Sequence, residues 1–318
     1  MSLLQREPMF NSLVILGASG FVGQAIIAQV PPNYSIKAVA RSVPLDASPK
    51  ATWYAADLLL RESLVQILKP GDTVINMAFM SMENVADNSS MITNIIDACL
   101  QCGVKQLIHF STATVIGVAK ETIVDETTVC KPVTKYDQIK LSIEQQLLAY
   151  ASDSFDVVIL RPTAIVGSNG KNLLKLANSI VKGNPFINYI RASLFGRRKM
   201  HLVSVRNVAS AALHLVARHE VSRGSIYFIS SDDDPENNFL SVENMLRKAL
   251  GFRERKWPVL PLPLICLSLL LKLKRQSASN VVRIHDSQKI QETNFVPVDS
   301  ISSAVNDFAC SFLKKPML

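Results

Sequence analysis

The chain has few cysteines, and their positions argue against two kinds of site. The five cysteines stand at positions 99, 102, 130, 266 and 310, a pattern that forms neither a disulfide framework nor a convincing metal set. Cys99 and Cys102 share a CxxC spacing, but they lie in an apolar predicted helix that ends at Gly103. We therefore expect buried thiols in a reducing compartment, no redox pair and no bound metal.

Long apolar runs are also scarce. Charged residues interrupt the amino terminus before any apolar run of signal-peptide length, so we predict that the chain stays in the cytoplasm. One run, residues 259–271, is shorter than the roughly 20 residues that span a membrane, contains prolines and is followed by basic residues. A helix over part of a second lobe is expected there, without stable membrane insertion. Association with a membrane surface is the alternative.

Acidic residues are fewer than basic ones. The 318 residues carry 34 Lys and Arg against 26 Asp and Glu, a formal net charge of +8. The basic residues are spread along the chain and form no patch interleaved with aromatics, so we predict no nucleic-acid partner. A basic cleft for a phosphorylated cofactor or substrate is the better interpretation. With 48% hydrophobic residues, the chain can bury a large core.

Glycine is sparse as well, yet three glycines fall within one short segment. Gly17, Gly20 and Gly23 follow the apolar run 13–16 and precede the apolar predicted helix 25–30. In a strand, tight turn and helix of this kind, main-chain N–H groups and the helix start stabilise a pyrophosphate. The segment therefore predicts a dinucleotide site, with these candidate contacts: Gly17, Ser19, Gly20, Phe21, Val22 and Gly23.

Predicted strands and helices alternate through the first half of the chain. The strands are residues 36–40, 72–76, 106–110 and 157–160, and the helices are residues 61–68, 88–101 and 139–150. This alternation predicts an α/β fold with a Rossmann-like, doubly wound parallel sheet and helices on both faces. After Ser168 the alternation loosens, although residues 200–205 and 225–229 are predicted to return to the sheet as strands. We predict a dinucleotide-binding Rossmann domain over 10–167, rejoined by 199–231, and a smaller interleaved C-terminal substrate lobe over 168–198 and 232–318.

Tyr136 and Lys140 stand one helical turn apart, which places them on the same helix face. An unperturbed tyrosine has a pKa of about 10, and a nearby ammonium and a positive nicotinamide ring would both lower it. Tyr136 would then exchange a proton with a substrate oxygen while hydride moves between carbon and nicotinamide. Together with the glycine segment, this pair predicts nicotinamide redox chemistry.

The residue after the second predicted strand discriminates between NAD and NADP. An acidic side chain there would accept hydrogen bonds from a ribose 2′-hydroxyl, whereas Arg41 and Ser42 offer a charge and a donor to a 2′-phosphate. We predict NADP (NADPH) as the preferred cofactor, with NAD as the alternative.

Seven segments occur in the order and spacing of the extended short-chain dehydrogenase/reductases, and the chain resembles this family over nearly its whole length. The likeness is to the NAD-dependent epimerase/dehydratase type, and within it to enzymes that act on nucleotide-linked sugars. The segments are GASGFVG (17–23), Asp57-Leu58, Asn76-Met77-Ala78, residues 110–117, Tyr136–Lys140, residues 161–167 and residues 205–209.

The resemblance implies roles for further residues. Thr112, with Ser111 as its neighbouring candidate, would donate a hydroxyl to the substrate oxygen that Tyr136 protonates, and Thr114 would reach the sugar. The implied cofactor contacts are Asp57 and Leu58 at the adenine, Met77 and Ala78 at the ribose and pyrophosphate, and Pro162 and Ile165 at the nicotinamide. From the residues alone, the basic cluster of Arg197, Arg198 and Lys199 suits a substrate diphosphate, and a solvated loop is the alternative.

Departures from the family pattern narrow the range of reactions that we expect. Ala113 and Thr114 replace the acidic pair of sugar-nucleotide dehydratases, which argues against dehydration. Ile116, Ala164 and Asn207 differ from many epimerases, and Asn207 is similar to reductases of 4-keto-6-deoxy nucleotide sugars. We expect an NADP(H)-dependent oxidoreductase that reduces a 4-keto nucleotide sugar. The alternatives are a nucleotide-sugar 4-epimerase with tightly bound NAD and a non-catalytic dinucleotide-sensing regulator. The resemblance also implies a homodimer.

Overall fold

The computed structural model describes residues 11–152, 155–218, 224–253, 255, 258–260 and 283–314. The chain divides into two compact units. The first comprises residues 1–110, 142–159 and 212–225, and the second comprises residues 111–141, 160–211 and 226–318. The helix predicted in the apolar run 259–271 falls on residues outside the described ones after Leu260. The domain limits predicted from the sequence stay a prediction.

A seven-stranded sheet has the strand order β10-β7-β5-β4-β1-β2-β3. Its strands are β1 (Asn11–Leu16), β2 (Tyr34–Ala40), β3 (Thr52–Ala55), β4 (Thr73–Asn76), β5 (Gln106–Phe110), β7 (Asp156–Pro162) and β10 (Ser225–Ile229). The β1–β2, β1–β4, β2–β3 and β4–β5 pairs are all parallel. The predicted Rossmann-like α/β fold is therefore confirmed, with a mostly parallel sheet.

The central strands are buried over most of their length. Residues 13–16 of β1 are at most 1% exposed, and β4 and β5 are buried throughout. Continuous apolar runs of this kind are typical of parallel strands that are covered on both faces. Asn76 and His109 are two of the buried polar residues of these strands, and they contact each other, because Asn76 Nδ2 lies 3.1 Å from His109 Nδ1.

The sequence located the helices of the first half, but some of their ends differ. These helices are α1 (Phe21–Gln29), α2 (Arg61–Val65), α3 (Val85–Cys102) and α4 (Lys135–Leu148). The helix α7 (Val205–Val216), in the second half, was not predicted. The helix α3 ends as predicted at Gly103, which has a left-handed conformation with φ of 69°.

The helix α4 begins at Lys135, four residues before the predicted start, and Thr134 explains the difference. Thr134 Oγ1 accepts a hydrogen bond from the main-chain N–H of Asp137 (3.2 Å), and the Asp137 carboxylate accepts one from the N–H of Thr134 (3.3 Å). This reciprocal pair satisfies two N–H groups at the helix start. Tyr136 therefore lies inside the first turn of α4.

One predicted strand does not join the large sheet. Residues 200–205 contain β9 (Leu202–Ser204), which pairs in parallel with β8 (Ala164–Val166) in a separate two-stranded sheet. The chain leaves the large sheet after β7, because the Thr163 N–H donates to Ile229 O whereas the Ala164 N–H donates to His201 O. The other two-stranded sheet pairs β6 (Ile123–Val124) with β11 (Ile284–His285).

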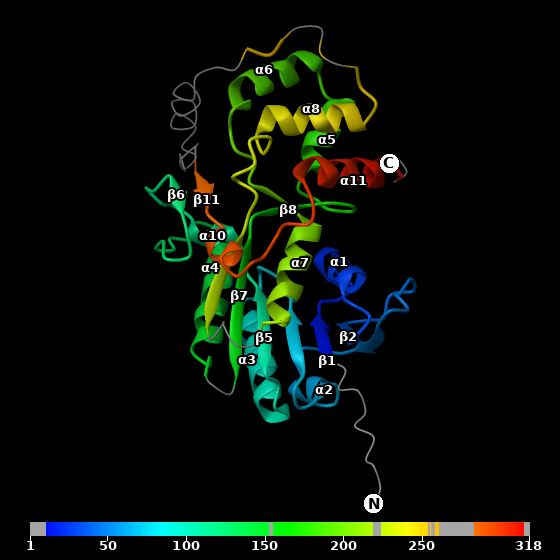
Figure 1. The fold of residues 1–318 in the computed structure, drawn as a ribbon, viewed down its shortest axis with the longest axis vertical. Helices are drawn as coiled ribbons and strands as arrows, with labels where there is room; N and C mark the ends of the chain where they lie inside the picture. The colour runs from blue at the N-terminus through cyan, green and yellow to red at the C-terminus, as the bar shows by residue number, and fades with distance from the viewer. Residues whose placement is uncertain are drawn as a thin grey trace, which may run out of the picture. The chain divides into compact units, whose positions relative to one another are not determined.

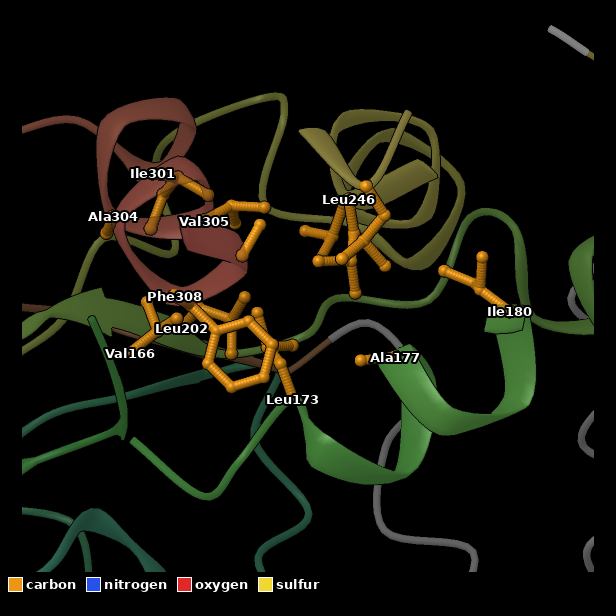
Figure 2. Close-up of a cluster of buried hydrophobic side chains, with 13 residues drawn as sticks. Val166, Leu173, Ala177, Ile180, Leu202, Leu246, Ile301, Ala304, Val305 and Phe308 are labelled. Atoms are coloured by element: carbon orange, nitrogen blue, oxygen red, sulfur yellow. The ribbon is translucent and has the colours of Figure 1, made fainter. Parts of the chain in front are cut away.

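The second unit has its own helical core. The helices α5 (Leu174–Lys182), α6 (Pro185–Phe195), α8 (Phe239–Ala249) and α11 (Ile301–Leu313) gather in one region, as Figure 1 shows. Figure 2 shows how α8 and α11 direct Leu246, Val305 and Phe308 toward Leu173 and Leu202. The short elements η1 (Ala113–Ile116) and α10 (Gln288–Gln291) complete the assignment. Within the described residues, no helix combines the length and the apolar character needed to cross a membrane.

Candidate active site

The glycine loop of the first unit is so tightly packed that it leaves little room for larger residues. Gly17 has φ of 83°, and the N–H groups of Gly17 and Ala18 both donate to Val39 O at 3.1 Å. A Cβ on Gly23 would lie 2.7 Å from Ala18 O and 2.8 Å from Gly17 O. A methyl group at Gly23 would therefore push the loop away from the start of α1. Such a cradle of bare backbone is what a pyrophosphate requires.

The start of α1 is also open to a ligand. Gly20 is the N-cap and supplies no side-chain hydrogen bond, and no acidic residue lies in the first turn. The first N–H groups of a helix have no partner within the helix, so they and the helix dipole favour an anion. Ser19 and Gly20 are exposed, and Phe21 and Val22 are half-buried. These residues fit a dinucleotide.

The turn after β4 is shaped by one buried amide. Asn76 Oδ1 accepts a hydrogen bond from the Ala78 N–H (3.0 Å), and the Met77 N–H donates to Leu16 O (3.0 Å). A Cβ on Gly17 would lie 3.2 Å from the Ala78 nitrogen. Met77 and Ala78 thus lie against the glycine loop, where the resemblance put a cofactor contact.

The remaining cofactor candidates of the first unit follow β2 and β3. Arg41 and Ser42 come directly after β2 and are exposed. Asp57 is exposed, and its Oδ1 accepts the Leu59 N–H at 3.0 Å, whereas the side chain of Leu58 is buried. These four residues are placed at the carboxyl ends of neighbouring parallel strands, where ligands bind in sheets of this type.

In the second unit, Tyr136 and Lys140 share one face of α4. Lys140 is only 4% exposed, and Tyr136 is half-buried. Burial raises the pKa of Tyr136 above its ordinary value, and the negative charge of Asp137 raises it further. The sequence predicted that the Lys140 ammonium and the nicotinamide ring would lower this pKa, whereas in the protein itself burial and the Asp137 charge raise it.

A chain of hydroxyl groups ends at Asp137. Thr112 Oγ1 lies 2.9 Å from Thr114 Oγ1, Thr114 Oγ1 donates to one carboxylate oxygen of Asp137, and Thr134 Oγ1 donates to the other at 2.6 Å. Because Thr114 gives its proton to the carboxylate, Thr112 must be the donor in the Thr112–Thr114 bond. The structure thereby brings Thr112 and Thr114 together as a coupled pair.

Sequence reasoning missed Asp137, which is 5% exposed and holds this arrangement in place. The Thr134-x-x-Asp137 spacing is a helix-start signature and was the signal that pointed to it. Ser111, the second hydroxyl candidate, is buried, and its Oγ has no hydrogen-bond partner among the described residues. Pro162 is buried at the end of β7, and Ile165 is half-buried in β8.

The basic cluster is only partly open to a ligand. Arg197 and Arg198 are exposed. Lys199 instead donates from Nζ to Asp232 O at 2.7 Å and to Asp234 O at 3.0 Å. Lys199 therefore ties down a turn, which leaves Arg198 as the better candidate for a substrate phosphate.

A second polar cluster joins three separate segments of this unit. Asp232 Oδ2 lies 2.7 Å from His201 Nδ1 and 2.9 Å from His285 Nδ1, and it also accepts the His285 N–H. These interactions outweigh the effect of burial and hold the pKa of Asp232 well below its usual range, whereas burial lowers the pKa of His285. The three residues are also metal-ligand types. Both imidazole Nδ1 atoms are within hydrogen-bond distance of the same carboxylate oxygen.

The described cysteines are free thiols. Cys99 is buried, and burial raises the pKa values of both Cys99 and Cys102. Because the thiolate is the reactive form, neither residue is activated for redox chemistry.

A profile of the NAD dependent epimerase/dehydratase family matches residues 13–230. The chain belongs to this family. The resemblance to the extended short-chain dehydrogenase/reductases is thus confirmed, and the protein is an enzyme of that group.

Two relatives illustrate the range of chemistry near this chain. It is 27% identical over 248 residues to the human "Sterol-4-alpha-carboxylate 3-dehydrogenase, decarboxylating", and the match covers 71% of this chain but only 64% of the human protein. It is 24% identical over 325 residues to the "N-acetyl-alpha-D-glucosaminyl-diphospho-ditrans,octacis-undecaprenol 4-epimerase" of Escherichia coli O157:H7, with 94% of both chains covered.

Solved structures share the fold. A UDP-glucuronic acid 4-epimerase from Bacillus cereus in complex with NAD has a TM-score of 0.72 at 17% identity, covering 94% of this chain and 96% of that one. The RMD protein from Pseudomonas aeruginosa complexed with NADPH has a TM-score of 0.68 at 18% identity, covering 96% and 100%. The family that matches this chain is described as NAD dependent, and this description supports a nicotinamide dinucleotide cofactor.

Proposed function

We propose that this enzyme is an NADP(H)-dependent oxidoreductase of nucleotide-linked sugars that reduces a 4-keto group. The observation that carries the proposal is the cluster on α4 and η1. Tyr136 and Lys140 share a helix face, and the Thr112–Thr114 pair is hydrogen-bonded to Asp137 in the same helical turn as Tyr136. Proton transfer to a carbonyl oxygen needs an acid, a group that tunes it and a second donor, and these residues supply all three.

The chain's residues divide the work. A bound nicotinamide dinucleotide would supply the hydride. Tyr136 gives its phenolic proton to the sugar oxygen, and the buried ammonium of Lys140 stabilises the phenolate that remains. Thr112 turns its hydroxyl from Thr114 toward the same oxygen and so polarises the carbonyl. Thr114 stays bonded to Asp137 and presents its oxygen to the sugar.

The glycine loop and the residues after β2 and β3 hold the cofactor in this proposal. Main-chain N–H groups at the start of α1 bind the pyrophosphate. Arg41 and Ser42, exposed after β2, bind a 2′-phosphate and so select NADP. Arg198 binds the diphosphate of the substrate.

A 4-epimerase is the second candidate, and the names of some relatives favour it. One relative that covers 94% of this chain is named a 4-epimerase, as are several proteins with the same fold, whereas another that covers 95% is named a sterol-4-alpha-carboxylate 3-dehydrogenase. An epimerase would use the same residues in both directions, taking the proton from a hydroxyl and returning it after the ketone has rotated. It would retain its dinucleotide between turnovers, whereas a reductase must exchange it.

The test separates the candidates by cofactor balance. The purified protein is analysed for retained dinucleotide and then incubated with NADPH and a 4-keto-6-deoxy nucleotide sugar, or with nucleotide-linked hexoses. The polyprenyl-diphosphate-linked N-acetylglucosamine isomer pair is included because one relative acts on that class.

A reductase consumes one NADPH for each alcohol formed. Interconversion of 4-epimers without net consumption, by a protein that keeps NAD, would replace the reductase with the epimerase. Dinucleotide binding without any turnover would favour the sensing regulator. The mass of the protein in solution tests the predicted homodimer.

A further inference from the structure

The helix α6 carries an exposed apolar face in the second unit. Phe186 is 69% exposed, Ile187 is 49% exposed and Ile190 is 41% exposed. At about 100° per residue, these three positions fall within one stripe of the helix, which we call the α6 face. Exposed apolar residues gathered in this way mark interaction surfaces.

The start of α6 and its opposite side are held by hydrogen bonds, and the α6 face therefore points outward. Asn184 Oδ1 accepts the Phe186 N–H at 2.8 Å, which caps the helix start. On the opposite side, Asn188 is buried, and its Nδ2 donates to Ser179 O at 2.6 Å. The apolar residues are therefore fixed in position before any partner binds.

Basic residues lie on the neighbouring elements. Tyr189 of α6 donates from Oη to Pro258 O at 3.1 Å, and Pro258 lines a cavity of about 600 Å³ on α8. Arg247, Lys248 and Arg253 also line this cavity. Among the lining residues that the structure describes, Glu236 is the acidic one, while Arg255 is paired with Glu243.

In the stretch of sequence around α6, the Lys and Arg residues have no Asp or Glu among them. Residues 157–218 contain ten Lys and Arg and no Asp or Glu. The basic residues are spread along the whole chain, but the acidic ones are missing from this segment, which includes both α5 and α6. The stretch of sequence that contains the α6 face therefore contributes basic residues and no acidic ones.

We infer that the α6 face docks on the surface of an anionic lipid bilayer. An aromatic and aliphatic face flanked by cations is the pattern that inserts at the headgroup boundary and attracts anionic lipids. A second copy of the chain is a poorer occupant, because a two-fold contact would bring the same basic residues face to face. The inference concerns binding and does not rest on the proposed reaction.

The test is sedimentation of the full-length protein with vesicles of phosphatidylcholine, alone or mixed with phosphatidylglycerol. We expect binding to the mixed vesicles and release at high salt. The variant F186S/I187S should lose binding at least tenfold, whereas F186L/I187L should retain it. The variant K248Q/R253Q should also lose about tenfold, because each basic residue near the surface contributes to the attraction.

The matched control is V43S/L45S, which removes two exposed apolar side chains from the first unit, at 46% and 108% exposure. It should bind vesicles as the wild type does. Thermal unfolding and dinucleotide titration confirm that each variant is folded. Failure of the wild type to bind mixed vesicles would overturn the inference, as would binding that F186S/I187S leaves unchanged. A dimer that F186S/I187S converts to a monomer, without vesicle binding, would assign the face to a second copy.

Discussion

At the start of α1 the chain presents main-chain N–H groups, whereas around Tyr136 it presents hydroxyls, a carboxylate and an ammonium. The glycine loop depends on the absence of side chains, since a Cβ on Gly23 would collide with Ala18 and Gly17. The cluster on α4 depends on polar side-chain atoms, since the hydroxyls of Thr114 and Thr134 donate hydrogen bonds to the two carboxylate oxygens of Asp137. Adding a methyl group should therefore damage the first region, and removing a polar atom should damage the second.

The largest effect should come from removing one oxygen at Tyr136. Tyr136→Phe deletes the proton donor, so turnover should fall by about 100- to 10,000-fold. Dinucleotide affinity should stay within a few-fold, because the loop is untouched. Steady-state kinetics and fluorescence titration measure the two quantities. Tyr150→Phe, at an exposed tyrosine, is the control and should behave as the wild type. Equal activity of the two variants would remove Tyr136 from the mechanism.

The second effect tests the opposite principle. Gly23→Ala places a methyl group 2.7 Å from Ala18 O, and overpacking of this kind costs about 1–3 kcal/mol. We expect dinucleotide affinity to fall about tenfold or more, measured by titration of NADPH fluorescence. Gly71→Ala is the control, because that position has φ of 85° but nothing within 4 Å. It should lower stability slightly and leave dinucleotide affinity intact. A Gly23→Ala variant with normal affinity would show that the loop has room to spare.

The sequence was sufficient for the elements that repeat a strong pattern. The glycine segment, the buried strands of the sheet and the Tyr136–Lys140 spacing depend on local order, and the strands lie where the apolar runs predicted them. The pairing of β9 with β8 could not be predicted, because it depends on which distant carbonyl the Ala164 N–H reaches. The same holds for Lys199, whose basic character suggested a phosphate but whose partners are carbonyls more than thirty residues away.

Asp137 was missed for a different reason. Its position beside Tyr136 was visible in the sequence, but the Thr112 and Thr114 hydroxyls come from a loop more than twenty residues earlier. The folded structure is needed to show that both oxygens of the Asp137 carboxylate accept hydrogen bonds. The sequence therefore predicts the site residues that belong to a local motif, but it does not predict those whose role depends on hydrogen bonds to distant segments.

Asp137→Asn should have a smaller and more diagnostic effect. One of the two threonine hydroxyls would face an amide nitrogen in place of an oxygen, and a hydrogen bond to a charged group contributes about 1.5–3 kcal/mol. We expect turnover to fall about tenfold. Because the Asp137 charge raises the pKa of Tyr136, its removal should lower that pKa.

The pH dependence gives the sign of this effect. Tyr136 must be protonated to act as an acid, so reduction is lost as the pH rises through its pKa. The alkaline limb of the pH–rate profile should therefore move to lower pH in Asp137→Asn. Asp87→Asn, at an acidic residue of α3, leaves this cluster intact and should not move the limb. A limb that stays in place in both variants would separate Asp137 from the titration of Tyr136.

The smallest effect should come from Arg41, because its side chain is exposed and solvent screens its charge. Arg41→Ala should weaken NADPH binding by up to about fivefold, the range of an exposed ion pair, and should leave NADH binding unchanged. The ratio of the two affinities is the measurement, since a loss of folded protein would lower both together. Arg61→Ala, at an exposed arginine of α2, is the control. Equal weakening of NADPH and NADH would show that Arg41 contacts a part common to both cofactors, and the preference for NADP would then need a side-chain donor elsewhere. In that case dinucleotide selectivity would depend on side-chain groups, as the proposed chemistry at Tyr136 does, and not on the main chain of the glycine loop.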